Sequence, residues 1–336
     1  MTEQTNTPTV GFTSHQGQRG EENDDHVAWF AIARPDRGHM VYIGVVADGV
    51  TSTSGGAQAS RIATEAIEAA LRDLPDSQET LTEWLDSALR SANDEILFEG
   101  KRNPEWQGMS TTVILAALAG RRLYLLHLGD SRAYLHRDGH LHQLTTDHTW
   151  AQAAVASGIL SETEAAHHPG RNQLQRYLGS NRQINVSHAV LAPGNGHAEE
   201  YLAVEPGDRI LLCSDGIYHR QGHATLEEIF NRRLSPQETV DTLIEAAVAQ
   251  GEIDDITALI FTVPTQTDEN MLSASVLQSS LHSQSADQDI TVPVNQPITP
   301  PPAEQEAAKR PRFGLLAFLV LIVVLALLIF LVLIFF

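Results

Sequence analysis

The sequence predicts an α+β domain in which antiparallel strands lie beside paired helices. Short runs rich in β-branched and aromatic residues end at Gly, Asp or Ser, which is typical of strands. Asp138-Gly139 joins two of these runs, 132–136 and 140–144, and is a two-residue hairpin signal. Because hairpin-linked strands stand beside paired helical stretches, the pattern favours layers of sheet and helix over a doubly wound parallel sheet.

Six further strands and three helices are expected along the chain. The strand runs, which share aliphatic, β-branched and aromatic residues, lie at 26–33, 39–48, 110–118, 121–131, 208–216 and 256–263. Apolar residues at helical spacing predict helices at 55–74, 77–97 and 235–251. The last helix has a capping signal, because Glu238 follows Ser235 by three residues and Gly251 stands at the end.

The overall charge and the cysteine content exclude several classes of protein. The chain of 336 residues carries 22 basic and 42 acidic residues, a formal net charge of −20. This charge disfavours non-specific attraction to nucleic acid, so no nucleic-acid partner is expected. A single cysteine, Cys213, excludes an internal disulfide framework and fits a reducing compartment.

The segment 313–336 is apolar throughout, with Gly314 as its one non-hydrophobic residue. As a helix it would rise roughly 36 Å at ~1.5 Å per residue, enough to cross a bilayer core of ~30 Å. Lys309, Arg310 and Arg312 precede it, and the positive-inside tendency places such residues in the cytoplasm. We therefore expect a single-pass C-terminal anchor in the lipid bilayer of the cell membrane, with the rest of the chain cytoplasmic.

Composition divides the remaining chain into three parts. Residues 1–8 are expected to be disordered and lack the basic-then-apolar order of a signal peptide. Residues 9–264 hold the expected strands and helices and are predicted to form one monomeric folded domain. Residues 265–312 are rich in Ser, Gln, Thr, Asp and Pro and end in a basic juxtamembrane stretch. Such a composition buries too little apolar area to order its backbone, which predicts a disordered tether.

Acidic residues recur at the ends of the expected strands. Three apolar runs end in an acid followed by a small residue, at Asp48-Gly49, Asp130-Ser131 and Asp215-Gly216. Two acidic pairs, Asp24-Asp25 and Asp254-Asp255, stand immediately before strand-like runs. A single Asp at a strand end is an ordinary turn residue. Five such positions would form a functional site if they meet at one edge of the sheets.

A cluster of this kind needs neutralising charge. Two carboxylates ~4 Å apart repel by ~4 kcal/mol at an effective dielectric constant of 20. Oxygen ligands without an accompanying cysteine favour Mn²⁺ or Mg²⁺ over zinc, and two such ions can activate a water for attack on phosphorus. The histidines, such as the pairs His167-His168 and His140/His142, lack metal-like spacing with acids and are interpreted mainly as surface or structural residues.

The order and spacing of these segments closely resemble the protein phosphatase 2C (PPM-type) family, in particular its bacterial branch. The resemblance spans roughly residues 9–264. Each motif alone is weakly specific, but together they stand in the family's order. The motifs are SHQGQRGEENDD at 14–25, VADGVTSTSGGAQAS at 46–60, MSTT at 109–112, LGDSRAYL at 128–135, LTTDH at 144–148, LLCSDG at 211–216 and DDIT at 254–257.

The resemblance implies a four-layer α-β-β-α sandwich of two antiparallel sheets flanked by helices, with two metal ions at one edge. Asp48 would bridge both ions, and the carbonyl of Gly49 would bind one of them. Asp215 and Asp254 would hold the first ion. The implied activity is metal-dependent hydrolysis of phosphoserine and phosphothreonine, with phosphoproteins as substrates and a cognate Ser/Thr kinase as the opposing partner.

The same resemblance assigns three more acids. Asp24 would stand beside the second ion with Asp25 next to it. Asp130 would bind a weaker third ion, shared with Asp215. The segment 147–179 resembles the flap beside the family's active site, which varies among members.

Three departures from the family pattern bear on this site. Gly20 stands where relatives place a phosphate-binding arginine, so Arg19, one position earlier, is the candidate bidentate donor to the substrate phosphate. Asp24 replaces the usual glutamate and is one methylene shorter, so its metal contact would pass through water. The residues after Gly49 are VTST where some relatives have a histidine, which leaves the proton donor to the leaving oxygen unassigned.

Two alternative functions stay open at this point. The departures at Arg19 and Asp24 also fit a catalytically weak or inactive binding module that keeps the fold and is tethered to the membrane. Phosphopeptide binding without hydrolysis at saturating Mn²⁺ would identify that module. The other alternative is the same two-metal chemistry on a nucleotide or nucleic acid, and the net charge of −20 counts against a nucleic acid.

Overall fold

A computed structural model describes residues 7–34, 39–51, 53–73, 80–180, 183–193 and 197–265. The chain divides into two units, Met1–Ser285 and Ala286–Phe336, and every described residue lies in the first. No helix within the described ranges is long and apolar enough to cross a membrane. The predicted anchor at 313–336, nearly all of the predicted tether at 265–312 and most of the N-terminal segment 1–8 lie outside the described residues.

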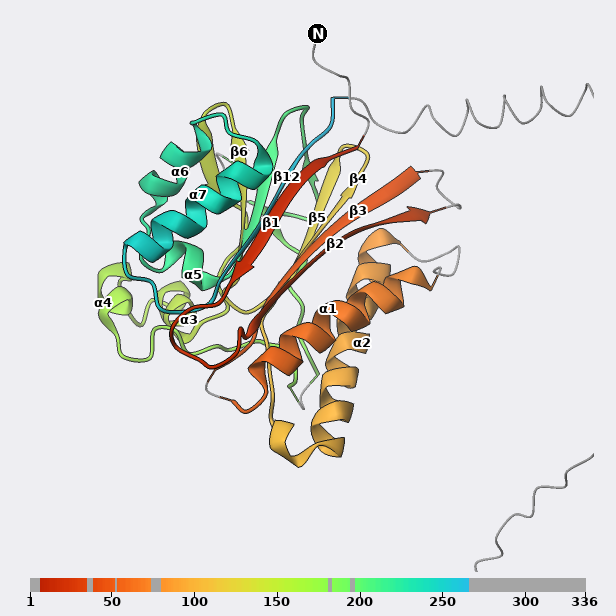
Figure 1. The fold of residues 1–336 in the computed structure, drawn as a ribbon, viewed down its shortest axis with the longest axis vertical. Coiled ribbons are helices and arrows are strands. Elements are labelled where there is room, and N and C mark those ends of the chain that lie inside the picture. Colours follow the sequence, from red (N-terminus) through yellow and green to blue (C-terminus); the bar gives the residue numbers. More distant parts are fainter. Residues whose placement is uncertain are drawn as a thin grey trace, which may run out of the picture. The chain divides into compact units, whose positions relative to one another are not determined.

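Two five-stranded sheets form the centre of the domain, and every strand pairing in the described residues is antiparallel (Figure 1). The first sheet has the order β1 (Thr9–His15), β12 (Ile256–Thr262), β11 (Arg209–Cys213), β6 (Arg132–Arg137) and β7 (His140–Gln143). The second has the order β10 (Leu202–Ala203), β5 (Arg122–Leu128), β4 (Val113–Ala119), β3 (His39–Asp48) and β2 (Asp25–Arg34). A separate small ladder pairs β8 (Val190–Leu191) with β9 (Ala198–Glu199).

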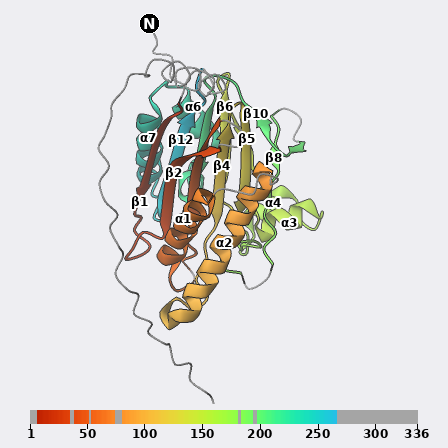
Figure 2. The ribbon, with the colours of Figure 1, turned by 90° about the vertical axis from the view of Figure 1, so that its right-hand side faces the viewer.

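Helices cover the outer face of each sheet. The β2–β3–β4–β5 face shares one buried apolar cluster with α1 (Gly56–Arg72) and α2 (Leu81–Arg102), which lie in front of the strands in Figure 2. The β11–β12–β6 face shares another with α5 (Asp215–Tyr218), α6 (His223–Phe230) and α7 (Pro236–Ala249). The described domain is therefore the four-layer α-β-β-α sandwich that the family resemblance implies. A short 3₁₀ turn (Pro104–Trp106) follows α2, and α3 (Trp150–Ala156) and α4 (Glu162–His167) lie in the segment after β7.

The two sheets pack on each other through a third apolar cluster, which includes Val46, Ile114, Leu212 and Leu259. Gly44 of β3 lets this layer close, because a Cβ there would lie 3.1 Å from the side chain of Leu259. Burial of aliphatic side chains on both inner faces supplies the main favourable free energy of such a layer. The packed layer fixes the relative position of the strand ends, which is what the site requires.

Most expected elements form, with differences at their ends. Asp138 and Gly139 have positive φ of 52° and 82°, as a two-residue hairpin turn requires. Ser235 and Glu238 form the expected capping box of α7. The expected strand at 208–216 instead ends at Cys213, and Asp215 begins α5. The chain turns there because Gly216 packs so closely on the Asp255 carbonyl that a Cβ would lie 2.2 Å from it.

Several short elements were not predicted, namely β1, α3, α4, α6 and β8–β10. All are too short or too polar for a clear period in the sequence. β1 pairs with β12 along its whole length, and α3 and α4 belong to the segment that resembles the family's flap.

Truncating Leu259 to alanine tests the role of the inter-sheet layer. Leu259 is fully buried, so Leu259→Ala should lower the free energy of unfolding by about 2–5 kcal/mol in urea denaturation. Val248 of α7 is 42% exposed, so Val248→Ala is the matched control with little expected change. Equal losses in the two variants would contradict the inter-sheet packing described here.

Candidate active site

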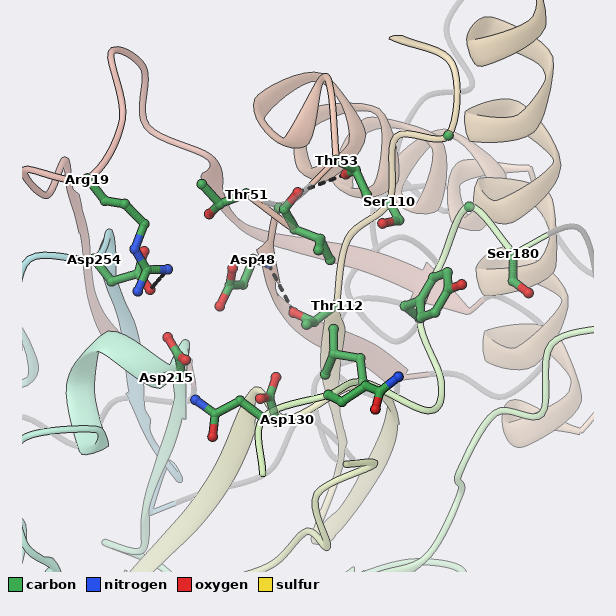
Figure 3. Close-up of a pocket in the computed structure, with 18 of the residues that line it drawn as sticks. Arg19, Asp48, Thr51, Thr53, Ser110, Thr112, Asp130, Ser180, Asp215 and Asp254 are labelled. Carbon is green, nitrogen blue, oxygen red and sulfur yellow. Dashed lines mark hydrogen bonds and ion pairs between the residues drawn. The ribbon is translucent and has the colours of Figure 1, made fainter. Parts of the chain in front are cut away.

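Four of the predicted acids line one pocket at an edge of the sandwich. Asp48, Asp130, Asp215 and Asp254 face a cavity of about 560 Å³, and Arg19 stands beside them. Figure 3 shows the four carboxylates around a common space. They come from the end of β3, the turn after β5, the start of α5 and the turn before β12. The structure thus brings together four of the five acidic positions that the sequence marks at the ends of strands.

Backbone interactions fix the position of Asp48. Its N–H donates to the hydroxyl of Thr112 (3.1 Å), and its carbonyl accepts from the hydroxyl of Thr111 (2.8 Å). The next residue, Gly49, has no room for a side chain, because a Cβ would lie 2.3 Å from the carbonyl oxygen of Gly56. The side chain of Asp48 is thus held at the pocket wall by the MSTT segment that precedes β4.

Asp255, which the sequence marked only as the partner of Asp254, braces the loop before β2. Its carboxylate accepts hydrogen bonds from the backbone N–H groups of Gly17 and Asp24, both at 2.7 Å. Gly17 passes so close to Asp254 that a Cβ would lie 2.2 Å from its carbonyl oxygen. Asp255 therefore holds the N-terminal loop, and with it Arg19, against the pocket.

Asp25 lies buried behind the pocket wall and does not line the cavity. It pairs with Asp48 across β2 and β3, and its carboxylate accepts a hydrogen bond from the hydroxyl of Ser214 at 2.8 Å. Asp24 does not line the cavity either: its carboxylate lies against Gly56 at the start of α1 and accepts hydrogen bonds from the N–H of Ala57 and the side chain of Thr51, which lines the cavity. Its predicted role beside the second ion stays a prediction.

The acids of the site raise one another's pKa values. Burial raises the pKa of Asp25 to about 8 and that of Asp215 to about 6. Burial followed by the charge of Asp215 raises the pKa of Asp130 to about 8. Burial also raises the pKa of Asp48 well above its ordinary value, and neighbouring charges raise it further, in the order Asp25, Asp215, Asp130 and Asp254. The clustered carboxylates of the site therefore attract positive charge.

Arg19 supplies one positive charge at the rim of the pocket. Its guanidinium forms an ion pair with Asp254 (2.5 Å) while its side chain stays 44% exposed. A guanidinium in this place can present a fork of N–H donors to a phosphate that enters the pocket. Its predicted contact with a phosphate stays a prediction.

The donor set fits hard divalent cations. Asp48, Asp130, Asp215 and Asp254 offer carboxylate oxygens, and no Cys lines the pocket within the described residues. In that part of the chain, no three His, Cys, Asp or Glu side chains already form a ligand set for one ion. Mg²⁺ keeps several waters, so the carboxylates do not have to form a closed ligand set before the ion binds. The attraction of these carboxylates for a cation, together with the relief of their mutual repulsion, favours the binding of such ions.

Sequence reasoning missed one pocket residue of chemical interest, His219. It follows Asp215 by one helical turn and lines the same cavity. Its Nδ1 lies 3.3 Å from a carboxylate oxygen of Glu252, which is buried. The interpretation of the histidines as surface or structural residues is therefore incomplete for His219. The spacing of four residues after a predicted metal ligand was the signal that could have identified it.

The comparisons with known proteins establish the family. A family model described as Protein phosphatase 2C matches residues 13–251. The chain therefore belongs to the protein phosphatase 2C family, which confirms the prediction from its motifs.

Two curated relatives show how far the likeness extends. Serine/threonine protein phosphatase PstP of Mycobacterium tuberculosis is 34% identical over 243 residues, which are 68% of this chain and 44% of PstP. Serine/threonine phosphatase stp of Listeria innocua is 28% identical over 251 residues, which are 74% of this chain and 93% of that protein. The chain thus spans less than half of the mycobacterial relative and nearly all of the listerial one.

Solved structures agree with the fold. The Mycobacterium tuberculosis phosphatase PstP matches with a TM-score of 0.63 at 31% identity, over 76% of this chain and 99% of that one. A structure of the catalytic domain of PstP in complex with two manganese ions matches with a TM-score of 0.60 at 29% identity, over 76% and 99% of the two chains.

The burial of the pocket acids and the repulsion among them predict a pH-dependent gain in stability when one acid is removed. The pKa of Asp130 rises from 3.8 to about 8 on folding, so the folded chain binds this proton more tightly than the unfolded chain. The protonated Asp130 carboxyl therefore contributes to the free energy of unfolding below about pH 4, and this contribution is lost as the pH rises toward 8.

In EDTA, Asp130→Asn should therefore have a higher Tm than the wild type at pH 8, by roughly 2–4 °C per kcal/mol, because the neutral amide avoids the burial of a charge and its repulsion by Asp215. The difference should shrink toward pH 4. Asp94→Asn, at an exposed position on α2, is the control with no such trend. A Tm difference for Asp130→Asn that is the same at both pH values would contradict the electrostatic account.

Proposed function

We propose that the chain is a protein serine/threonine phosphatase that hydrolyses phosphoserine and phosphothreonine with two Mn²⁺ or Mg²⁺ ions and opposes a Ser/Thr kinase. The convergence of Asp48, Asp130, Asp215 and Asp254 on one pocket is the observation that carries this proposal. Membership of the protein phosphatase 2C family supports it, as do the two manganese ions in the PstP catalytic domain.

The ions, when bound, supply an activated water and neutralise negative charge on the phosphoryl group. Asp48 would hold both of them and the Gly49 carbonyl one of them, with Asp215 and Asp254 on the first. Asp24 would stand beside the second ion with Asp25 next to it, and Asp130 would bind a weaker third ion. These oxygens stand on different elements whose ends are fixed by the sheets, so the ligands are positioned before substrate arrives.

Arg19 would receive the phosphate. Its guanidinium lies at the rim of the pocket beside Asp254, where it can donate two parallel N–H bonds to phosphoryl oxygens. The loop that carries Arg19 is tied down by Asp255, so the donor does not have to be ordered by the substrate.

Removing a central carboxylate tests the proposal. With Mn²⁺ and a phosphothreonine peptide, Asp48→Asn and Asp215→Asn should each lower kcat by about 100-fold or more, since metal ions contribute several kcal/mol to transition-state stabilisation. Asp94→Asn, an exposed carboxylate on α2, should retain wild-type kcat. Equal phosphate release by wild type and both site variants would remove the assignment.

The main alternative is a binding module that keeps the fold without turnover. It is favoured if the wild-type chain binds the phosphopeptide in calorimetry at saturating Mn²⁺ but releases no phosphate. Release of phosphate by the wild-type chain under the same conditions favours the enzyme over this alternative.

We further propose that the segment 313–336 anchors the chain in the cell membrane with the phosphatase domain in the cytoplasm. The support is the uninterrupted apolar composition of this segment and the basic residues Lys309, Arg310 and Arg312 just before it.

Flotation with phospholipid vesicles tests the anchor. Chain 1–336 should float with the vesicles and stay bound at high salt and alkaline pH, whereas chain 1–312, which keeps the basic residues, should not. Recovery of chain 1–336 in the soluble fraction, or equal flotation of both chains, would contradict the anchor.

A further inference from the structure

A histidine and a buried glutamate form a pair beside the four carboxylates of the pocket. His219 follows the last residue of α5 and lines the main pocket together with Asp215. It also lines a neighbouring cavity of about 330 Å³. Its Nδ1 is 3.3 Å from Oε2 of Glu252, whose side chain is 1% exposed, while the His219 side chain is 29% exposed. The ring therefore spans from the protein interior to the pocket.

The surroundings of Glu252 explain why the ring is held in one orientation. Oε1 of Glu252 accepts hydrogen bonds from the backbone N–H groups of Ile253 (2.8 Å) and Asp254 (3.1 Å). Oε2 is buried and has no well-aligned hydrogen bond within the described chain. Its nearest cationic groups are Nδ1 of His219 and, at 3.8 Å, Nε of Arg220. A buried carboxylate oxygen needs such a partner, which favours an N–H at Nδ1 pointing to Glu252.

With Nδ1 facing Glu252, Nε2 is the ring nitrogen left for the pocket, which the partly exposed His219 side chain lines. His219 is the only imidazole among the described residues that line the main pocket. The pocket also contains the acids that attract the ions and the phosphate. Nε2 can therefore exchange a proton with a substrate oxygen in the pocket.

Hydrolysis of an alkyl phosphate creates a need for such a proton. The leaving oxygen of serine or threonine is a strongly basic alkoxide unless it is protonated as the P–O bond breaks. A positioned proton donor contributes typically 10²–10⁴-fold to such a step. No residue of the VTST segment after Gly49 carries an imidazole that could do this.

We propose that His219 is the general acid of this site and that Glu252 is its positioning residue. The inference rests on the phosphatase function proposed above. A water oxygen forms a bond to phosphorus, the bond between phosphorus and the substrate oxygen breaks, and its electron pair stays on that oxygen. The ring acts as the imidazolium, with Nδ1–H toward Glu252, and the proton on its Nε2 transfers to the leaving oxygen and yields the free alcohol. The attacking water loses its proton to solvent, and the imidazole regains one from solvent.

The test compares two leaving groups, because proton donation matters for an alkoxide and matters little for p-nitrophenolate. His219→Gln should lower kcat on a phosphothreonine peptide by about 10²–10⁴-fold. The same variant should stay within a few-fold of wild type on p-nitrophenyl phosphate. Glu252→Gln should show the same selective loss at smaller size, since Gln keeps an acceptor for the backbone N–H groups but loses the charge that orients the ring.

His140→Gln is the matched control. His140 is another histidine near a carboxylate, 3.9 Å from Glu227, but it lies on β7 outside the pocket. It should retain wild-type kcat on both substrates. Equal loss on both substrates in His219→Gln, or no loss on either, overturns the general-acid role.

A measurement on the wild type alone keeps the inference testable if the His219 variant does not fold. Across a series of aryl and alkyl phosphates, proton donation predicts a shallow dependence of kcat/KM on the pKa of the leaving alcohol, and a steep dependence overturns it. The proposed phosphatase function is tested separately: it is contradicted if the wild type releases no phosphate from any of these esters with Mn²⁺.

Discussion

The burial of several mutually repelling carboxylates at one edge of the sandwich is the constraint on which the rest of this structure depends. Asp25, Asp48, Asp130 and Asp215 are close enough that burial and neighbouring charges raise the pKa of each. A cluster of this kind lowers the stability of the fold unless cations compensate it. The remaining architecture holds these acids together against that cost, and the same repulsion is what attracts divalent ions.

The two sheets do most of this holding. The antiparallel register of β2 and β3 sets Asp25 opposite Asp48, and the packed layer between the sheets brings the ends of β5 and β11 to the same edge. Local interactions then refine the position of each group: Thr111 and Thr112 hold Asp48, and Asp255 holds the loop that carries Arg19. Glu252 faces the His219 ring from the interior, with Oε2 3.3 Å from Nδ1. Rigid elements and buried polar contacts thus prepare the site before any ligand enters.

The sequence predicted the layered fold from strong local signals, and the resemblance of its motifs to the protein phosphatase 2C family predicted that the strand-end acids meet. Apolar periodicity, the Asp138-Gly139 hairpin and acids after apolar runs survive in any tertiary context. The orientations of Asp24, Asp25 and His219 could not be predicted, because each depends on packing between segments far apart in the chain. Asp24 turns toward the start of α1, and Asp25 lies behind the wall. The role of His219 is recognisable only from its contact with Glu252, which lies on the loop before β12.

Anomalous scattering from crystals of the chain soaked in Mn²⁺ would test the central claim most directly. The account predicts two strong manganese peaks in the pocket, both in contact with Asp48 and one of them also with Asp215 and Asp254. Manganese bound only elsewhere on the surface, or an empty pocket at saturating Mn²⁺, would contradict it.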